Sequence, residues 1–208
     1  MIRGVSSRLL AVISVCALLG CASGEEQAPP PGAPPAMTPE QQQAMQAYLE
    51  QQAPGEHQAH LEPLVGHFNA RVKQWEAPNQ PPTESTGVLD NTWALGGRFV
   101  LSQYHGEELG MPFDGLGLLG YDTVLQKHVS NWADSMGTFL WPTATGECSD
   151  GGKVITLSRV MNDPMTGGLI KIRDVTTIVD HDHFTYEMYF TKPGADEFKM
   201  LEAHYVRA

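Results

Sequence analysis

Strand signals recur about every ten to fifteen residues between Val65 and Arg207, and no helical pattern of useful length interrupts them. Turn residues such as Gly96-Gly97 and Pro193-Gly194 separate neighbouring signals. Consecutive strands joined by short turns pair as an up-and-down antiparallel sheet, and closing a sheet of about ten strands removes its exposed edges. We therefore predict an all-β fold, a single antiparallel up-and-down barrel. The expected strands cover residues 66–76, 84–94, 98–108, 113–121, 127–135, 138–148, 153–161, 169–179, 183–192 and 197–206.

The first 21 residues have the pattern of an export signal. Arg3 and Arg8 precede an apolar run from Leu9 to Leu19 that is too short to span a bilayer. The run ends in Leu18-Leu19-Gly20-Cys21, which resembles the bacterial lipoprotein cleavage box. The resemblance implies cleavage before Cys21 and a lipid on its thiol, with the outer membrane, facing the periplasm, as the destination because Ala22 rather than Asp follows. An ordinary cleaved signal and an uncleaved anchor are the alternatives.

Three further segments follow the signal. Residues 22–37 form a Pro-rich tether with too little apolar surface to fold, and we expect it to be disordered. Residues 38–64 form a helical lead-in of one or two short helices: Thr38-Pro39-Glu40-Gln41 is typical of a helix start. We expect these helices to cover one end of the barrel domain, residues 65–208.

Charge and cysteine content restrict the partners. The formal net charge of -11 excludes a broad basic surface for nucleic acid, so the membrane is expected as a partner only through the lipid anchor. Cys16 leaves with the signal and Cys21 carries lipid, which leaves Cys148 alone and excludes an intramolecular disulfide in the mature chain. We interpret Cys148 as a half-buried strand residue, with a reactive thiol as the alternative. Nothing indicates an oligomeric state.

Five blocks occur in order along the chain: His60 to Gly66, Gly110 to Phe113 with Gly115 and Gly117, Gly120-Tyr121-Asp122, Trp132 to Thr138, and Asp163 to Gly167. Together these blocks resemble the bacterial family called domain of unknown function 1579, from about residue 57 to the C-terminus. The resemblance implies a small β-barrel of the lipocalin-like, calycin type and no assigned activity. Gly66-His67-Phe68 also resembles the lipocalin Gly-x-Trp start, with Arg207 where lipocalins place a closing Arg, although Phe68 replaces the Trp.

The hairpins place large side chains around two strand glycines. If the turn near residue 124 lies midway between strands 113–121 and 127–135, Gly117 lies opposite Trp132 and Gly115 opposite Asp134. If the turn near residue 110 lies midway between strands 98–108 and 113–121, Gln103 and His105 lie on the other side of the two glycines. Aromatic walls with few polar groups are typical of a small-molecule pocket, and packing of rings over glycine is the alternative. The expected ligand-binding residues are Trp93, Gln103, His105, Gly115, Gly117, Trp132, Asp134 and Trp141.

Two further groups of residues could carry chemistry. His105 and Asp134 could form a hydrogen-bonded pair able to act as a general base, or a satisfied polar contact. Glu187 and Glu202 are expected to face each other across two strands, with Arg173 one diagonal step away as the cation between them. We interpret this charged cluster as structural rather than as acid–base machinery.

The other motifs in the sequence give weaker evidence of function. Gly115 to Gly120 matches G-x-G-x-x-G, but no helix follows to hold a pyrophosphate. Ser135 lacks the glycines of a nucleophile elbow. Asp180 to His183 has metal-ligating residue types but is typical of a polar turn, and a haem barrel using His105 rests on fold analogy alone. We expect no cofactor, no metal and no catalytic residue.

The sequence therefore favours an envelope barrel that binds a small, partly apolar ligand. An enzyme on the same scaffold, using His105 with Asp134 or Glu187 with Glu202, is one alternative. An interaction module with a filled barrel is the other.

Overall fold

The computed structural model describes residues 36–208. The predicted export signal, the lipidation of Cys21 and nearly all of the predicted tether lie outside the described residues. Because the chain divides into the units Met1–Gln42 and Gln43–Ala208, the second unit is described by itself below.

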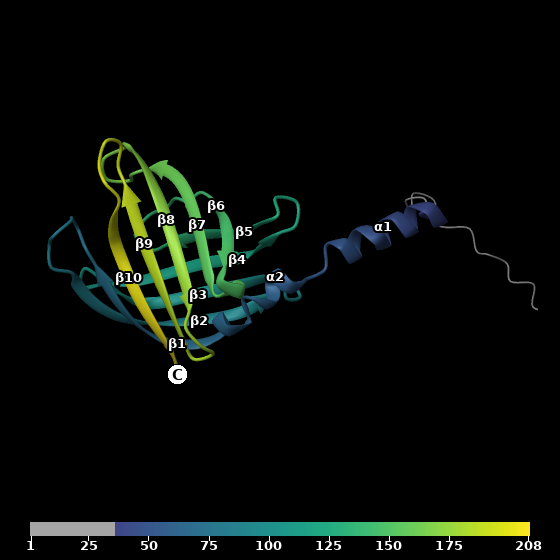
Figure 1. Ribbon diagram of the computed structural model, residues 1–208, viewed down its shortest axis with the longest axis horizontal. Coiled ribbons are helices and arrows are strands. Elements are labelled where there is room, and N and C mark those ends of the chain that lie inside the picture. Colours follow the sequence, from purple (N-terminus) through teal and green to yellow (C-terminus); the bar gives the residue numbers. More distant parts are fainter. Residues whose placement is uncertain (1–35) are drawn as a thin grey trace, which may run out of the picture. The chain divides into compact units, whose positions relative to one another are not determined.

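Ten antiparallel strands form a closed barrel in the order β1-β10-β9-β8-β7-β6-β5-β4-β3-β2 (Figure 1). Every strand pairs with its neighbours in the sequence, and β10 closes the barrel on β1. The predicted all-β up-and-down barrel is therefore confirmed. The strands are β1 (Gly66–Gln74), β2 (Thr83–Ala94), β3 (Phe99–Glu108), β4 (Met111–Asp122), β5 (Lys127–Asp134), β6 (Ala144–Ser149), β7 (Val154–Asn162), β8 (Leu169–Ile178), β9 (His183–Thr191) and β10 (Phe198–Arg207).

The sixth strand is shorter than predicted. We expected a strand over 138–148, but residues 135–143 form an irregular segment between β5 and β6. Pro142 has no N–H to give to a strand ladder. Two ladder-like bonds remain in the segment: the Ser135 N–H donates to the Asp114 carbonyl at 2.8 Å, and the Trp141 N–H donates to the Trp132 carbonyl at 2.9 Å. This segment lies beside the candidate site described below.

The lead-in contains α1 (Pro39–Gln51), α2 (Glu56–Ala59) and the 3-10 helix η1 (Glu62–Leu64). Thr38 and Gln41 form the expected reciprocal cap: the Gln41 N–H donates to Thr38 Oγ1 at 3.3 Å, and the Thr38 N–H donates to Gln41 Oε1 at 2.9 Å. No residue of α1 is buried. Among residues 36–208, no helix combines the length and hydrophobicity needed to cross a bilayer.

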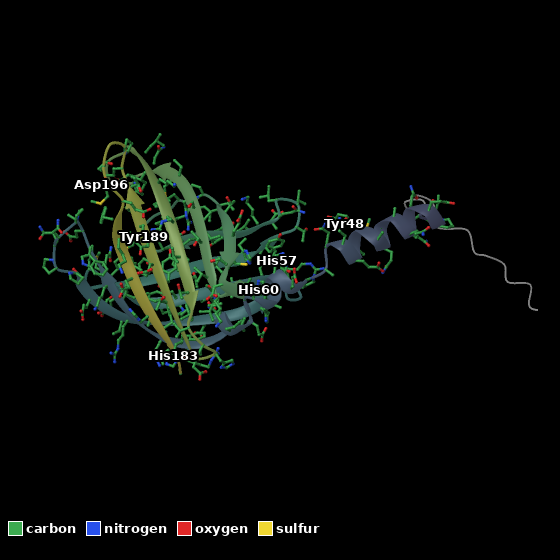
Figure 2. The ribbon with its side chains drawn as sticks, viewed as in Figure 1. Tyr48, His57, His60, His183, Tyr189 and Asp196 are labelled. Atoms are coloured by element: carbon green, nitrogen blue, oxygen red, sulfur yellow. The ribbon has the colours of Figure 1, made fainter. Side chains whose placement is uncertain are left out.

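The segment with α2 and η1 covers one end of the barrel, whereas α1, which was also expected to cover it, has no buried residue. Leu61 is 0% exposed and Leu64 is 2% exposed, and both belong to the main hydrophobic core. The buried Asn91 side chain in β2 donates to the Leu64 carbonyl at 2.7 Å. Figure 2 shows His57 and His60 at this end, which we call the α2 end. The far end is the opposite one, where β7 finishes and β8 begins.

Arg207 closes the barrel over the start of β1. Its guanidinium lies 4.5 Å from the Phe68 ring centroid and donates to the Val65 and Pro63 carbonyls at 2.8 and 3.0 Å. A Cβ atom at Gly66 would lie 2.0 Å from Arg207 Nη1, and Gly66 has a φ of +145°. Only glycine therefore allows this contact. Arg207, at the end of the last strand, is thus joined to Phe68 at the start of the first.

Candidate functional site

The two strand glycines and their predicted partners meet as expected on one side only. Gly117 pairs with Trp132 and Gly115 with Asp134, which confirms the centred β4–β5 turn. On the other side, however, Gly115 pairs with Tyr104 and Gly117 with Ser102. The predicted neighbours, Gln103 and His105, instead pair with Leu116 and Asp114 and are exposed on the outer face. Those two assignments were wrong by one residue.

The turn between β3 and β4 explains the error. It has two residues, Leu109 and Gly110, with φ of 52° and 76°. Two successive positive φ values are typical of the tight type I′ hairpin turn. The prediction assumed a longer connection, and a slip of one residue moves every side chain of a strand to the opposite face.

The space beside the glycines is filled. A Cβ atom at Gly115 would lie 2.1 Å from Trp132 Cζ2, and one at Gly117 would lie 2.9 Å from Trp132 Cε3. The indole ring therefore occupies the volume that the missing side chains leave, and its Nε1 donates to Asp134 Oδ2 at 3.0 Å. The expected hollow between the glycines and Trp132 is absent at this position.

Of the two possible acid–base pairs, His105 with Asp134 does not form, and Glu187 with Glu202 is bridged by a lysine. His105 Nδ1 bonds Asp114 Oδ1 at 2.6 Å on the outer face, so the predicted pair with Asp134 was wrong. Glu187 and Glu202 do face each other, but the cation between them is Lys199, whose Nζ bonds Glu187 Oε1 at 2.8 Å and also Glu202.

Arg173, the cation predicted for that cluster, is engaged elsewhere. Its Nη2 and Nε donate to Glu197 at 2.6 and 3.0 Å. Hydrogen bonds from Lys199 and His204 lower the pKa of Glu202, so this carboxylate is ionised near neutral pH. The charged cluster is thus an ion network on the outer face of β8, β9 and β10.

The remaining predicted residues lie far apart. Trp93 is near the α2 end, where its Nε1 donates to Glu62 Oε2 at 2.8 Å. Trp141 belongs to the irregular segment after β5 and packs against a second hydrophobic cluster. The eight predicted ligand-binding residues therefore do not share one site, and only Trp141 belongs to the site that the structure assembles.

That site centres on a buried ion pair at the far end. Register places Arg159 on β7 and Asp174 on β8 among inward-facing residues, and their side chains are 3% and 5% exposed. Arg159 Nη2 donates to Asp174 Oδ2. The Tyr186 hydroxyl on β9 donates to Asp174 Oδ1 at 2.9 Å. Burial and the Asp174 charge raise the pKa of Tyr186 well above its usual value, so the hydroxyl stays protonated.

Trp141 completes the group from the irregular segment. The Arg159 guanidinium lies 5.3 Å from the Trp141 ring centroid, and Arg159 Nη1 donates to the Pro142 carbonyl at 3.5 Å. Arg159 Nε and Trp141 Nε1 are both buried and have no hydrogen-bond partner within residues 36–208. Buried donors are rarely left unpaired. Around them lie the apolar residues Met161, Ile170, Ile172, Met188, Phe190, Met200 and Leu201.

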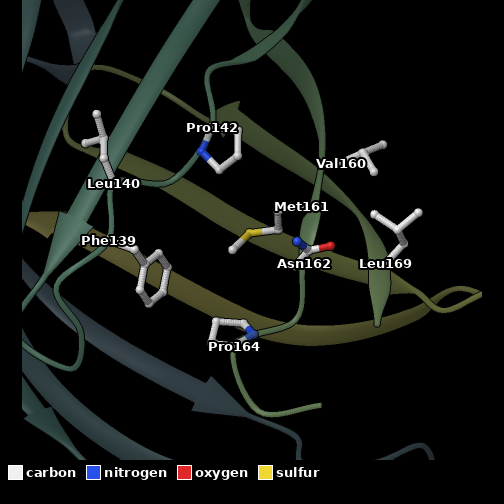
Figure 3. A pocket seen from close by; sticks show the side chains of 8 residues that line it. All are labelled: Phe139, Leu140, Pro142, Val160, Met161, Asn162, Pro164 and Leu169. Carbon is white, nitrogen blue, oxygen red and sulfur yellow. The ribbon is translucent and has the colours of Figure 1, made fainter. Parts of the chain in front are cut away.

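An apolar cleft of about 470 Å³ adjoins this group. Figure 3 shows Phe139, Leu140 and Pro142 on one side, Val160 and Leu169 on the other, and Met161 between them. Asn162 and Pro164 complete the lining. Neither Trp141 nor Arg159 lines the cleft, but two lining residues connect it to them: the Pro142 carbonyl accepts from Arg159, and Met161 belongs to the apolar cluster against which Trp141 packs.

Sequence reasoning missed Arg159, Asp174 and Tyr186. The alternation of apolar and polar residues along 154–162 does place Arg159 on the face of Ile155 and Leu157. A charge on an apolar face was the available signal, because such a charge needs a partner on a neighbouring strand.

Comparisons with known proteins agree with the fold. The crystal structure of Rv2717c from M. tuberculosis is similar at 19% identity with a TM-score of 0.51, covering 75% of this chain and 99% of that one. More distant are a redesigned β-barrel, b11L5F_LGL (12% identity, TM-score 0.38, 74% and 96% covered), and EF1p2_mFAP2b bound to DFHBI (12% identity, TM-score 0.40, 74% and 100% covered). The likeness to Rv2717c concerns the fold alone.

A search of curated proteins finds no significant match. The family model described as a protein of unknown function, DUF1579, matches residues 53–207. That range includes η1, all ten strands and the closing Arg207. The resemblance expected from the sequence blocks is therefore confirmed, and the chain belongs to the DUF1579 family.

Proposed function

We propose that the barrel binds a small, partly apolar molecule at its far end, and that an oxygen of this molecule accepts hydrogen bonds from Trp141 and Arg159. One observation carries the proposal: two buried N–H donors have no partner among the described residues, and the surroundings of these donors share Pro142 and Met161 with an apolar cleft. Small-molecule sites typically combine an apolar wall with a few convergent polar groups.

The energetics favour such a ligand. A buried donor without a partner costs about 1–3 kcal/mol, and a ligand oxygen that pairs with it removes this cost. The Arg159 charge is already balanced by Asp174, so a carbonyl oxygen suffices and a carboxylate is not required. The apolar body of the ligand would lie along Phe139, Leu140 and Met161.

Displacement of a fluorescent probe tests this proposal. The full-length protein is loaded with 1-anilinonaphthalene-8-sulfonate, which is then displaced by 1-naphthoate, 1-naphthaldehyde or naphthalene, three compounds with one ring system. We expect both oxygen-bearing compounds to bind more tightly than naphthalene, by about two- to tenfold for each hydrogen bond gained.

Two tryptophan variants provide the matched comparison. Trp141→Phe keeps the aromatic ring but removes the donor, so the preference for oxygen should shrink. Trp93→Phe, at the α2 end, should leave the preference unchanged. Equal affinity for all three compounds, or an unchanged preference in Trp141→Phe, would contradict the proposed site. Native mass spectrometry of the purified protein would then look for a co-purifying molecule.

We also propose that the barrel is exported and anchored by a lipid on Cys21, facing the periplasm from the outer membrane. The support is the sequence pattern alone: the basic start, the short apolar run and the Leu-Leu-Gly-Cys motif. Cells fed radiolabelled palmitate should label the wild-type protein in the membrane fraction. Cys21→Ser should lose the label and Cys16→Ser should keep it; labelling of Cys21→Ser would refute the anchor.

A further inference from the structure

Four side chains with metal-ligating atoms converge at the α2 end, away from the proposed ligand site. His57 lies in α2, His60 caps that helix, His128 is on β5 and Cys148 is on β6. One ligand atom from each residue lies within 4.8 Å of the corresponding atoms of the other three. The cluster thus joins the lead-in segment to two strands of the barrel.

The spacing of these atoms approaches that of a tetrahedral zinc site. Zinc bonds of about 2.0–2.1 Å to nitrogen and about 2.3 Å to sulfur place neighbouring tetrahedral ligand atoms roughly 3.3–3.6 Å apart. Cys148 Sγ and His60 Nδ1 are already 3.6 Å apart. The widest pairs would need to close by roughly 1 Å around a metal ion.

Two of the imidazoles present unpaired nitrogen atoms in the interior. His57 Nδ1 and His128 Nε2 are both buried and have no hydrogen-bond partner among the described residues. Neutral imidazole nitrogen is a good zinc ligand, and buried polar atoms are otherwise almost always paired. Two orphaned imidazole nitrogen atoms, in a group whose ligand atoms lie within 4.8 Å of one another, therefore indicate a bound ligand in this group.

The surrounding residues hold the rings in place. Tyr121 stacks on His57 with 3.9 Å between ring centroids and 14° between planes. Gly152 has a φ of +93°, and a Cβ atom there would lie 2.5 Å from His60 Cγ, so glycine makes room for this ring. His128 pairs with Gly146 across β5 and β6, and Cys148 follows two residues later on the same inward face.

We propose that His57, His60, His128 and Cys148 bind one Zn²⁺ ion. One sulfur and three nitrogen atoms in a tetrahedral arrangement suit zinc. The thiol of Cys148 gives up its proton to form the thiolate–zinc bond. Four protein ligands leave no open position, so the ion is structural and fastens α2 to β5 and β6. This proposal is independent of the ligand site at the far end.

Cobalt substitution tests the site directly. The full-length protein is stripped with a chelator and titrated with Co²⁺, whose tetrahedral complexes absorb strongly in the visible range and whose thiolate bonds give a near-ultraviolet charge-transfer band. We expect one equivalent to bind with both features, and Zn²⁺ to displace it. His60→Gln and Cys148→Ser should weaken binding at least about tenfold, and Cys148→Ser should lose the charge-transfer band. His105→Gln, an outer-face histidine, is the control and should bind like the wild type.

Alkylation of the unmutated protein gives a readout that needs no variant to fold. Iodoacetamide modification of Cys148, followed by peptide mass spectrometry, should slow at least about tenfold when one equivalent of Zn²⁺ is present. An alkylation rate at Cys148 that Zn²⁺ does not change would overturn the proposal. So would an unaltered cobalt spectrum in Cys148→Ser.

Discussion

Trp132 illustrates how one aromatic residue can account for two glycines. Its indole ring covers Gly115 and Gly117, so a methyl group added at Gly115 meets the ring at 2.1 Å. Overpacking of this kind destabilises a protein by about 1–3 kcal/mol. We expect Gly115→Ala to lose that much stability in urea unfolding. Gly168→Ala is the control: its added Cβ meets only Thr166 Oγ1 at 3.7 Å, and it should change stability by less than about 0.5 kcal/mol. Equal effects of the two variants would refute the packing role.

Adjacent charges on one strand have opposite environments. Asp174 is buried with Arg159, whereas Arg173 pairs with Glu197 at a partly exposed position. Removing one partner of a buried pair leaves an uncompensated charge and costs about 3–5 kcal/mol. Asp174→Asn should therefore be severely destabilising. Glu197→Gln, the same chemical change outside, should cost at most about 1 kcal/mol. Urea unfolding at neutral pH compares the free energies of unfolding of the two variants. Similar losses of stability would show that the Arg159–Asp174 pair is solvated.

At the scale of elements, the β3–β4 hairpin contains a correctable strain. Leu109 occupies a φ of 52° before Gly110 in the two-residue turn. Asn-Gly is a preferred sequence for a type I′ turn because Asn tolerates positive φ. We expect Leu109→Asn to stabilise the protein by about 0.5–1 kcal/mol. The shift of the urea midpoint measures it, with Leu140→Asn, in the irregular segment, as an exposed control. A loss of stability on Leu109→Asn would mean that the Leu109 side chain contributes packing.

The outer face of β9 and β10 predicts a pH dependence. The hydrogen bonds from Lys199 and His204 lower the pKa of Glu202 below its unfolded value of about 4.3. The folded state therefore binds fewer protons than the unfolded state, and the stabilisation present above about pH 4.3 is lost as pH falls through the lowered pKa. In urea unfolding between about pH 3 and pH 7, Glu202→Gln should show a shallower acid loss than the wild type. Glu84→Gln is the control, and parallel curves for the wild type and Glu202→Gln would contradict this role.

The strands were predictable because alternation and turn residues are local properties. The register was harder, since it depends on the number of residues in each turn: the β4–β5 pairing was right and the β3–β4 pairing was wrong by one residue. The prediction of Arg173 as the cation between Glu187 and Glu202 was wrong for another reason. Lys199 reaches Glu187 and Glu202 from a neighbouring position along a bulged strand, and no spacing rule identifies such a contact. The cluster of His57, His60, His128 and Cys148 joins distant parts of the chain and appears only after folding.

At the scale of the whole molecule, the start of the folding unit can be located by mutation. Leu61 precedes the first strand but is 0% exposed in the main core, whereas Leu49 in α1 is 50% exposed. Truncating a fully buried leucine costs about 2–5 kcal/mol through lost burial and the remaining cavity. We therefore expect Leu61→Ala to lose that amount in urea unfolding.

Leu49→Ala makes the same truncation on an exposed surface and should change stability by less than about 0.5 kcal/mol. If the two variants lost equal stability, α1 would have to contribute to the cooperative unit. If neither lost any, the cover at the α2 end would be separable from the barrel. The expected contrast places the boundary of the folded barrel between residues 49 and 61, upstream of the first strand, so that closure of the barrel and docking of α2 occur as one transition.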